Sequence, residues 1–425
     1  MQSDCFPDAT KDWLKAPVST LAEINPRYPV KKGKEYPFIE MASVGENFGG
    51  ILKIESRKME GSGLSKYQAK DTLFAKITPC PENGKIAFVD EITDKYGLGS
   101  TEFTVLSPHE NCNPRFLYHL LCSHEVRGRA IARMEGSTGR QRVPNDVFER
   151  RLIVPVPSER ERDNIVIILD AIDNVQVCLK KSLAQAVNIR LAMMQAAFHF
   201  EMTSEPRINT EAGRIPQSWE ALKGKKAFTV LTGGSSSVSA INPLRGSEVV
   251  DSWFMKVDDF NLPENSRKIV KTKIGFVAAN NEKFKLLPIG VIVIAKRGAA
   301  ILKNRVRTTT VPVALDPNLM ALKVREDICP EFFRYQLEWR NLTRYVESSG
   351  IPQLNNKDLY PRWFVRAPEG QQKEIVAVIS AAERHVDALQ DKLRALETLK
   401  KSLMHDLLTG TVRVDPAPFK ETTPL

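Results

Sequence analysis

The stretch Ile375–Leu407, IVAVISAAERHVDALQDKLRALETLKKSLMHDL, decides the fold class of this chain. Apolar residues recur in it at alternating steps of three and four, with one break at Lys400. This spacing is the seam of a coiled coil, and neither proline nor glycine interrupts it. The stretch therefore predicts a long helix that packs against another helix. Its expected seam residues are Ile375, Ile379, Leu389, Leu393 and Leu396.

The same pattern occurs once before in the chain. Ser158–Phe198 aligns without a gap on Pro368–Leu408 at an offset of 210, and its basic break, Arg190, falls where the second copy has Lys400. The sequence thus predicts two long helices of one design. The end of the first helix stays open. The expected seam residues of the first copy are Ile165, Leu169, Leu179 and Leu183.

The repeat extends, more weakly, into the segments that precede the helices. Leu73–Ile77 resembles Val293–Arg297, Asn113–Leu121 resembles Cys329–Leu337, and Trp13 can be set against Trp219. The offsets drift from 206 to 220, which indicates loops of different length on a shared scaffold. Short β-type runs alternate with helical stretches in both segments, so we expect two mixed α/β units. The strand order does not follow from the sequence.

The length and composition agree with this plan. A chain of 425 residues suggests two to four compact units, and its 42% apolar and 26% charged residues are ordinary globular values. We therefore divide the chain into a first unit, a central helix, a second unit, a C-terminal helix and a tail. The expected bounds are 1–157, 158–205, 206–367, 368–410 and 411–425.

The charge points to a polyanionic partner. The formal net charge is +10, and the excess lies in the second unit, where residues 206–368 carry 26 Lys and Arg against 15 Asp and Glu. No apolar run approaches the ~18 residues that a membrane span needs, and the first twenty residues do not read as a secretory signal. The six cysteines form no C-x-x-C pair. We expect a cytoplasmic protein with reduced thiols that does not enter a membrane.

The familiar catalytic signatures are missing from the sequence. The Gly-Lys pairs at Gly33, Gly84 and Gly224 are followed by Glu, Ile and Lys, so none supplies the Ser or Thr of a P-loop. A Pro-Pro dipeptide, which adenine methyltransferases use to hold a flipped base, does not occur, and neither does an Asp/Glu-x-Lys pair of a metal-dependent nuclease. We expect no catalytic residues, although an unfamiliar active site stays open.

One group of residues has side chains that could serve as metal ligands. His109, Cys112, His119, Cys122 and His124 fall within sixteen residues, and a His-x-x-Cys pair can supply zinc ligands. The aligned positions of the second copy hold residues such as Ile328 and Tyr335, so the same scaffold folds there without ligands. We favour a structural role for this group and expect no metal site.

Several strings resemble those of the specificity subunits of type I restriction-modification systems, in the same order and over nearly the whole chain. Each string is weakly specific alone, but their order within a duplicated architecture is a strong signal. The strings are Leu73–Ile77, Gly99–Leu106, Ile215–Trp219, Gln371–Ile379 and, as the most family-like, Asp406–Val414.

The resemblance implies an α+β fold. Two mixed α/β target recognition domains, each reading half of a split DNA site, are separated by two long antiparallel coiled-coil helices in a pseudo-twofold internal repeat. A helix of ~40 residues is ~60 Å long, so helix length sets the gap between the half-sites. Because the two units differ in sequence and charge, the bipartite DNA target is expected to be asymmetric.

The resemblance also implies partners. Two methyltransferase subunits dock on such a chain and methylate adenine with S-adenosylmethionine, and a restriction subunit that uses ATP and Mg can join them. This chain itself is then expected to hold no cofactor. Two alternatives stay open: a stand-alone DNA-modifying enzyme with an unrecognised active site, and a coiled-coil scaffold with no nucleic-acid role.

Reading of bases needs Arg, Lys, Gln or Asn on loops that enter a groove, whereas phosphate contacts need only positive charge. The paired loops ahead of each helix are the best candidates for base reading, and the basic residues around the other matching strings are candidates for phosphate contacts. The base-reading candidates are Arg140, Gln141, Arg142, Gln353, Asn355 and Asn356. The phosphate candidates are Lys76, Lys85, Lys296, Arg297, Lys303, Arg305 and Arg307.

Overall fold

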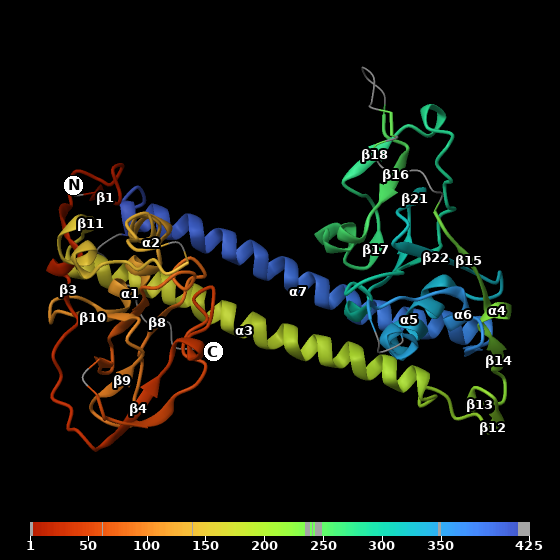
Figure 1. Ribbon diagram of the computed structural model, residues 1–425, viewed down its shortest axis with the longest axis horizontal. Helices are drawn as coiled ribbons and strands as arrows, with labels where there is room; N and C mark the ends of the chain where they lie inside the picture. Colours follow the sequence, from red (N-terminus) through yellow and green to blue (C-terminus); the bar gives the residue numbers. More distant parts are fainter. Residues whose placement is uncertain are drawn as a thin grey trace. The chain divides into compact units, whose positions relative to one another are not determined.

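The computed structural model describes residues 3–61, 63–137, 139–233, 239, 241–242, 249–346 and 350–414. Two long helices dominate it, α3 (Glu159–Phe198) and α7 (Glu369–Thr409) (Figure 1). The chain divides into two compact units, and each unit contains half of each long helix. Unit 1 comprises Met1–Leu179 with Leu393–Leu425, and unit 2 comprises Lys180–Lys392.

Unit 1 holds three small sheets, with α1 (Pro114–Cys122) and α2 (His124–Ile131) beside them. Helix α1 begins where Asn113 accepts the Arg115 backbone N–H at 2.9 Å and Pro114 occupies the first turn. The sheets are β1–β11–β2 (Ser3–Asp4, Leu152–Val156, Leu14–Pro17), β3–β10–β7–β8 (Ala22–Ile24, Phe103–Pro108, Thr72–Ala75, Ile86–Phe88) and β5–β4–β9–β6 (Glu55–Lys58, Glu35–Ile39, Gly97–Gly99, Ser65–Tyr67).

Unit 2 repeats this plan around α5 (Pro330–Arg340), with the short helices α4 (Gly224–Ala227) and α6 (Asn356–Leu359). A hairpin of β12 (Arg207–Thr210) and β13 (Gly213–Pro216) follows α3. The remaining sheets are β14–β23 (Glu220–Lys223, Trp363–Arg366), β15–β22–β19–β20–β17 (Phe228–Leu231, Leu319–Val324, Ile292–Ala295, Val306–Thr309, Lys268–Ile269) and β18–β16–β21 (Ile274–Phe276, Ser252–Met255, Val313–Leu315).

The strand order confirms the internal repeat. The order β3–β10–β7–β8 of unit 1 matches β15–β22–β19–β20 of unit 2, and the parallel pair β4–β9 matches the parallel pair β16–β21. Single contacts repeat as well, because the Trp13 indole N–H donates to Glu161 at 2.9 Å and the Trp219 indole N–H donates to Gln371 at 2.6 Å. The two units are therefore copies of one mixed α/β scaffold.

The two long helices pack antiparallel, as the family resemblance implied. In unit 1 the start of α3 shares a core cluster with the end of α7, through Ile165, Leu169 and Leu407. In unit 2 the end of α3 shares a core cluster with the start of α7, through Phe198 and Ile379. Of the predicted seam residues, Ile165, Leu169, Ile375, Ile379 and Leu389 are buried, and Leu179, Leu183, Leu393 and Leu396 are half-buried.

Each basic residue that interrupts a seam forms an ion pair with an acidic residue of the other helix. In unit 1 Lys400 of α7 forms an ion pair with Asp173 of α3. In unit 2 Arg190 of α3 forms an ion pair with Glu383 of α7, with 2.7 Å between Nη2 and Oε1. Asp173 and Glu383 are separated by the same offset of 210 as Arg190 and Lys400. The duplicated helices thus carry one duplicated ion pair.

The first helix ends at Phe198, short of the predicted limit of the spacer at residue 205. Among the residues that the structure describes, no helix combines the length and the apolar character needed to cross a membrane.

Candidate nucleic-acid interface

The fold brings two distant strings of unit 1 side by side. The backbone N–H of Val143 donates to the Lys76 carbonyl at 2.9 Å, and the N–H of Thr78 donates to the Gln141 carbonyl at 3.0 Å. The segment after β7 therefore runs beside the loop that precedes α3. Lys76 also donates its N–H to the Glu102 carbonyl at 2.9 Å, which ties this pair of segments to the start of β10.

Unit 2 makes the same arrangement from the aligned residues. The N–H of Leu354 donates to the Lys296 carbonyl at 2.9 Å, and the N–H of Gly298 donates to the Pro352 carbonyl at 2.8 Å. Lys296 in turn donates its N–H to the Asn318 carbonyl at 2.7 Å. The two strings that the sequence analysis singled out separately are therefore parts of one surface in each unit.

On the unit 1 surface, Arg140, Gln141 and Arg142 are exposed. The Arg142 guanidinium forms two hydrogen bonds of 2.8 Å to the Glu102 carboxylate, and these bonds raise its pKa. Lys76 is half-buried, and burial lowers the pKa of its amine. Among the described residues the Arg140 and Gln141 side chains have no polar partner, so they are the groups most available to a ligand.

On the unit 2 surface, Arg297, Lys303, Gln353 and Asn356 are exposed, while Lys296 is half-buried. Lys303 closes the short helix η8 (Ile301–Lys303), which follows β19. Asn355 has a structural role instead. It is the N-cap residue of α6, and its backbone N–H donates to the Asp358 carboxylate at 2.7 Å. Its side-chain oxygen accepts a hydrogen bond from the Gln353 amide at 3.3 Å.

Three further candidates hold local contacts. The Lys85 amine donates to the Met41 carbonyl at 3.1 Å, and the Arg305 guanidinium donates to Asn261 at 2.5 Å. The Arg307 guanidinium donates to the Asn265 carbonyl at 3.2 Å, and burial lowers its pKa. A phosphate contact by any of these side chains would compete with the existing bond.

Ile351 belongs to the unit 2 surface and was not among the sequence candidates. Its side chain is 82% exposed, and it directly precedes Pro352, whose carbonyl pairs with Gly298. At the offset of 211 that relates the two loops, Ile351 occupies the position of Arg140. The alignment of the loops could have identified Ile351, but a search for polar base-reading residues passes over an isoleucine.

One member of the histidine and cysteine group, His119, takes part in an ion cluster. The His119 imidazole Nε2 lies 2.7 Å from the Asp170 carboxylate, and the Arg115 guanidinium lies 2.6 Å from the same group. His119, Asp170 and Asp173 have the spacing of metal ligands. However, Arg115 and Lys400 already supply cations to the two carboxylates. His109 instead contacts the Ser19 carbonyl at 3.1 Å.

Comparison with known proteins agrees with the resemblance found in the sequence. Residues 11–188 match the family model described as the type I restriction modification DNA specificity domain. The EcoAI type I restriction enzyme specificity subunit of Escherichia coli is 32% identical over 159 residues, which are 36% of this chain and 27% of that protein. This chain therefore aligns with about a quarter of the length of that relative. The resemblance that the sequence indicated is confirmed.

Two further likenesses extend over most of the chain. A Methanocaldococcus jannaschii protein named as the type I restriction enzyme MjaX specificity subunit is 23% identical over 420 residues, covering 95% of this chain and 94% of that protein. The crystal structure of a type I restriction-modification S subunit from M. genitalium matches with a TM-score of 0.57 at 15% identity, covering 95% and 97% of the two chains. At this identity the structural likeness establishes the fold.

Proposed function

Because residues 11–188 match the model of the type I restriction modification DNA specificity domain, we propose that the whole chain is a DNA-recognition subunit. It binds an asymmetric, bipartite site in double-stranded DNA in the cytoplasm, and each unit reads one half of the site. The observation that carries this proposal is the repeated surface. In both units a lysine after a central strand, Lys76 or Lys296, is backbone-paired with the exposed loop ahead of a long helix.

In this proposal partner subunits, and not this chain, carry out the methylation and restriction reactions. S-adenosylmethionine, ATP and Mg belong to two methyltransferase subunits and, where present, to restriction subunits. The outward side of α3 supports the docking of such partners. Ile167, Val175 and Val177 in unit 1, and Ile189 and Leu191 in unit 2, are each about half exposed. Large apolar groups left in water on a helix favour a protein partner.

Sequencing of modified bases in the DNA of the source cell, with and without the gene, tests the proposal. A split motif with a fixed gap is expected to lose its adenine methylation when the gene is deleted. Methyl transfer by the purified chain alone would favour the stand-alone enzyme. DNA affinity that does not respond to salt would favour the scaffold, because neutralised phosphates make DNA binding steeply salt-dependent.

Replacing Lys303 with alanine is expected to weaken binding to all DNA sequences by a similar factor. The side chain is exposed and forms no hydrogen bond or ion pair with the described residues. Its charge lowers the pKa of Asp258 only through space, so the amine can still contact a phosphate. The plot of log Kd against log salt should lose about one unit of slope. Titrations at several salt concentrations measure this. Lys373→Ala is the control, because that lysine is tied to Glu369 on α7, and an equal change in both variants would contradict the assignment.

A further inference from the structure

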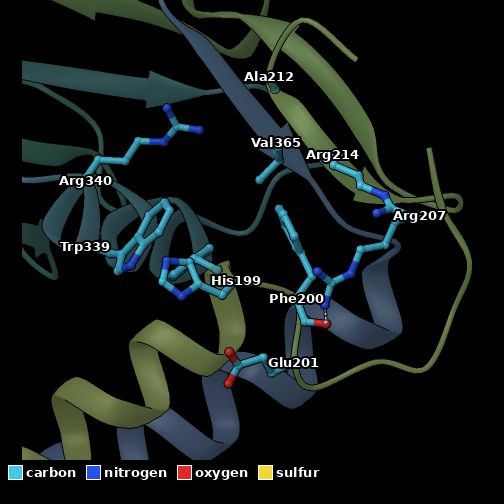
Figure 2. A pocket seen from close by; sticks show the side chains of 10 residues that line it. His199, Phe200, Glu201, Arg207, Ala212, Arg214, Trp339, Arg340 and Val365 are labelled. Atoms are coloured by element: carbon cyan, nitrogen blue, oxygen red, sulfur yellow. Dashed lines mark hydrogen bonds between the residues drawn. The ribbon is translucent and has the colours of Figure 1, made fainter. Parts of the chain in front are cut away.

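Unit 2 contains a cavity that the DNA-reading surfaces do not use. It lies where α3 ends, between the β12–β13 hairpin and the end of α5, and has a volume of about 390 Å³. Figure 2 shows Phe200, Arg207 and Arg214 on one side of it and His199, Trp339 and Arg340 on the other. Phe198 also lines the cavity, so three guanidinium groups and four aromatic rings surround one space.

The arginines of this cavity have no carboxylate partner among the described residues. The Arg207 guanidinium donates to the Phe200 carbonyl at 3.1 Å. The Arg214 side chain forms no hydrogen bond or ion pair with the described residues. The Arg340 guanidinium faces the Phe364 ring at 5.2 Å, and its Nε is buried without a hydrogen-bond partner. The Glu201 carboxylate also lines the cavity. Arg207 and Arg214 are exposed and Arg340 is half-buried, so three guanidinium groups and one carboxylate share this space. This excess of positive charge favours an anionic ligand.

A strained residue forms part of the wall. Phe200 has φ of 64°, in the left-handed region that favours glycine, and the aligned residue at the end of α7 is Gly410, with φ of 72°. The Phe200 ring packs edge-on against Trp219 at 5.1 Å and lies 6.0 Å from the Arg207 guanidinium. A non-glycine residue in this conformation is strained. The ring is therefore kept at a position where the repeat itself supplies a glycine.

We propose that this cavity binds a nucleoside phosphate. Arginine forks suit the oxygens of a phosphate, and the aromatic walls suit the flat ring of a base. The volume lies at the small end of the range for ligand sites, which suits one nucleotide better than a longer segment. An acidic peptide would satisfy the arginines but would leave the aromatic walls without a partner.

Isothermal titration of the full chain with AMP, inorganic phosphate and adenosine tests the proposal. AMP is expected to bind saturably, and phosphate and adenosine each at least tenfold more weakly. Arg214→Gln and Arg340→Gln should each weaken AMP binding about tenfold. Phe200→Gly relieves the backbone strain while removing the ring, so it should fold and still bind AMP several-fold more weakly. Arg384→Gln, an exposed arginine of α7 in the same unit, is the control.

The proposal is overturned if AMP does not bind at millimolar concentration, if the cavity variants bind as wild type does, or if an acidic peptide binds in place of AMP. Sequence-specific DNA affinity should be unchanged in all cavity variants. Since the proposed function does not depend on this site, failure of AMP binding leaves DNA recognition standing.

Discussion

Replacing Glu383 with glutamine is expected to lower the free energy of unfolding by about 3–5 kcal/mol. The Glu383 carboxylate accepts hydrogen bonds from Arg334 at 2.8 Å, from Arg190 at 2.7 Å and from the Tyr335 hydroxyl at 2.8 Å. The Arg334 side chain is only 1% exposed. The substitution removes the carboxylate that it shares with Arg190, and Glu331 and Glu338 are left to balance the two cations. Urea denaturation of both proteins measures the difference.

The pH dependence gives a second readout of the same cluster. Despite its burial, Glu383 has a pKa lowered from the ordinary 4.5 to about 2 by its arginine partners. A carboxylate whose folded pKa is depressed stabilises the fold fully above its unfolded pKa, and it loses that contribution as the pH falls from about 4.5 towards 2. Glu383→Gln should lack this part of the acid-induced loss.

Glu374→Gln is the matched control, because that residue of α7 is exposed. It should change the free energy of unfolding by less than about 0.5 kcal/mol. A Glu383→Gln protein as stable as this control would show that the cluster contributes nothing net.

The long helices illustrate what the sequence could determine. The three-and-four spacing of apolar residues predicted both helices and their seam, because helical periodicity is a local property. It also located the breaks at Arg190 and Lys400. The acidic partners were not predicted, since Glu383 and Asp173 lie on the opposite helix and meet the breaks only in the antiparallel arrangement.

The sheets illustrate the limit of prediction from the sequence. Strands such as β17 and β1 have only two residues, and runs this short carry no periodicity that fixes a partner. The parallel pairs β4–β9 and β16–β21 join segments separated by long loops, and this pairing is a tertiary result.

The candidate site shows the same division. The internal repeat identified the strings around Lys76 and Arg142 separately. Only the structure shows that their backbones are hydrogen-bonded to each other. The sequence could not separate Arg140, which is exposed without a partner, from Asn355, which caps a helix. Capping depends on the local backbone, whereas the identity of the residue is the same in either role.

Replacing Arg140 with alanine is expected to relax the sequence preference at one position of one half-site. It should also weaken specific binding about 10- to 100-fold, because a good contact from arginine to guanine contributes about 1–3 kcal/mol. Arg140 is exposed on the unit 1 surface and has no side-chain partner among the described residues. Ile351→Ala should relax one position of the other half-site, where an exposed apolar group suits a thymine methyl. Selection of bound sites from randomised half-sites measures both changes.

The two variants, Arg140→Ala and Ile351→Ala, are expected to act independently of each other. In the proposed function each unit reads its own half-site, so each variant should leave the other half of the motif intact, and the double variant should relax both. Arg150→Ala is the control, because its side chain is 72% exposed in the same unit but lies outside the paired loop. It should keep the whole motif even if its affinity falls with the lost charge. If Arg140→Ala and Ile351→Ala both select the wild-type motif, the paired loops do not read bases, and the readers must lie elsewhere in each unit.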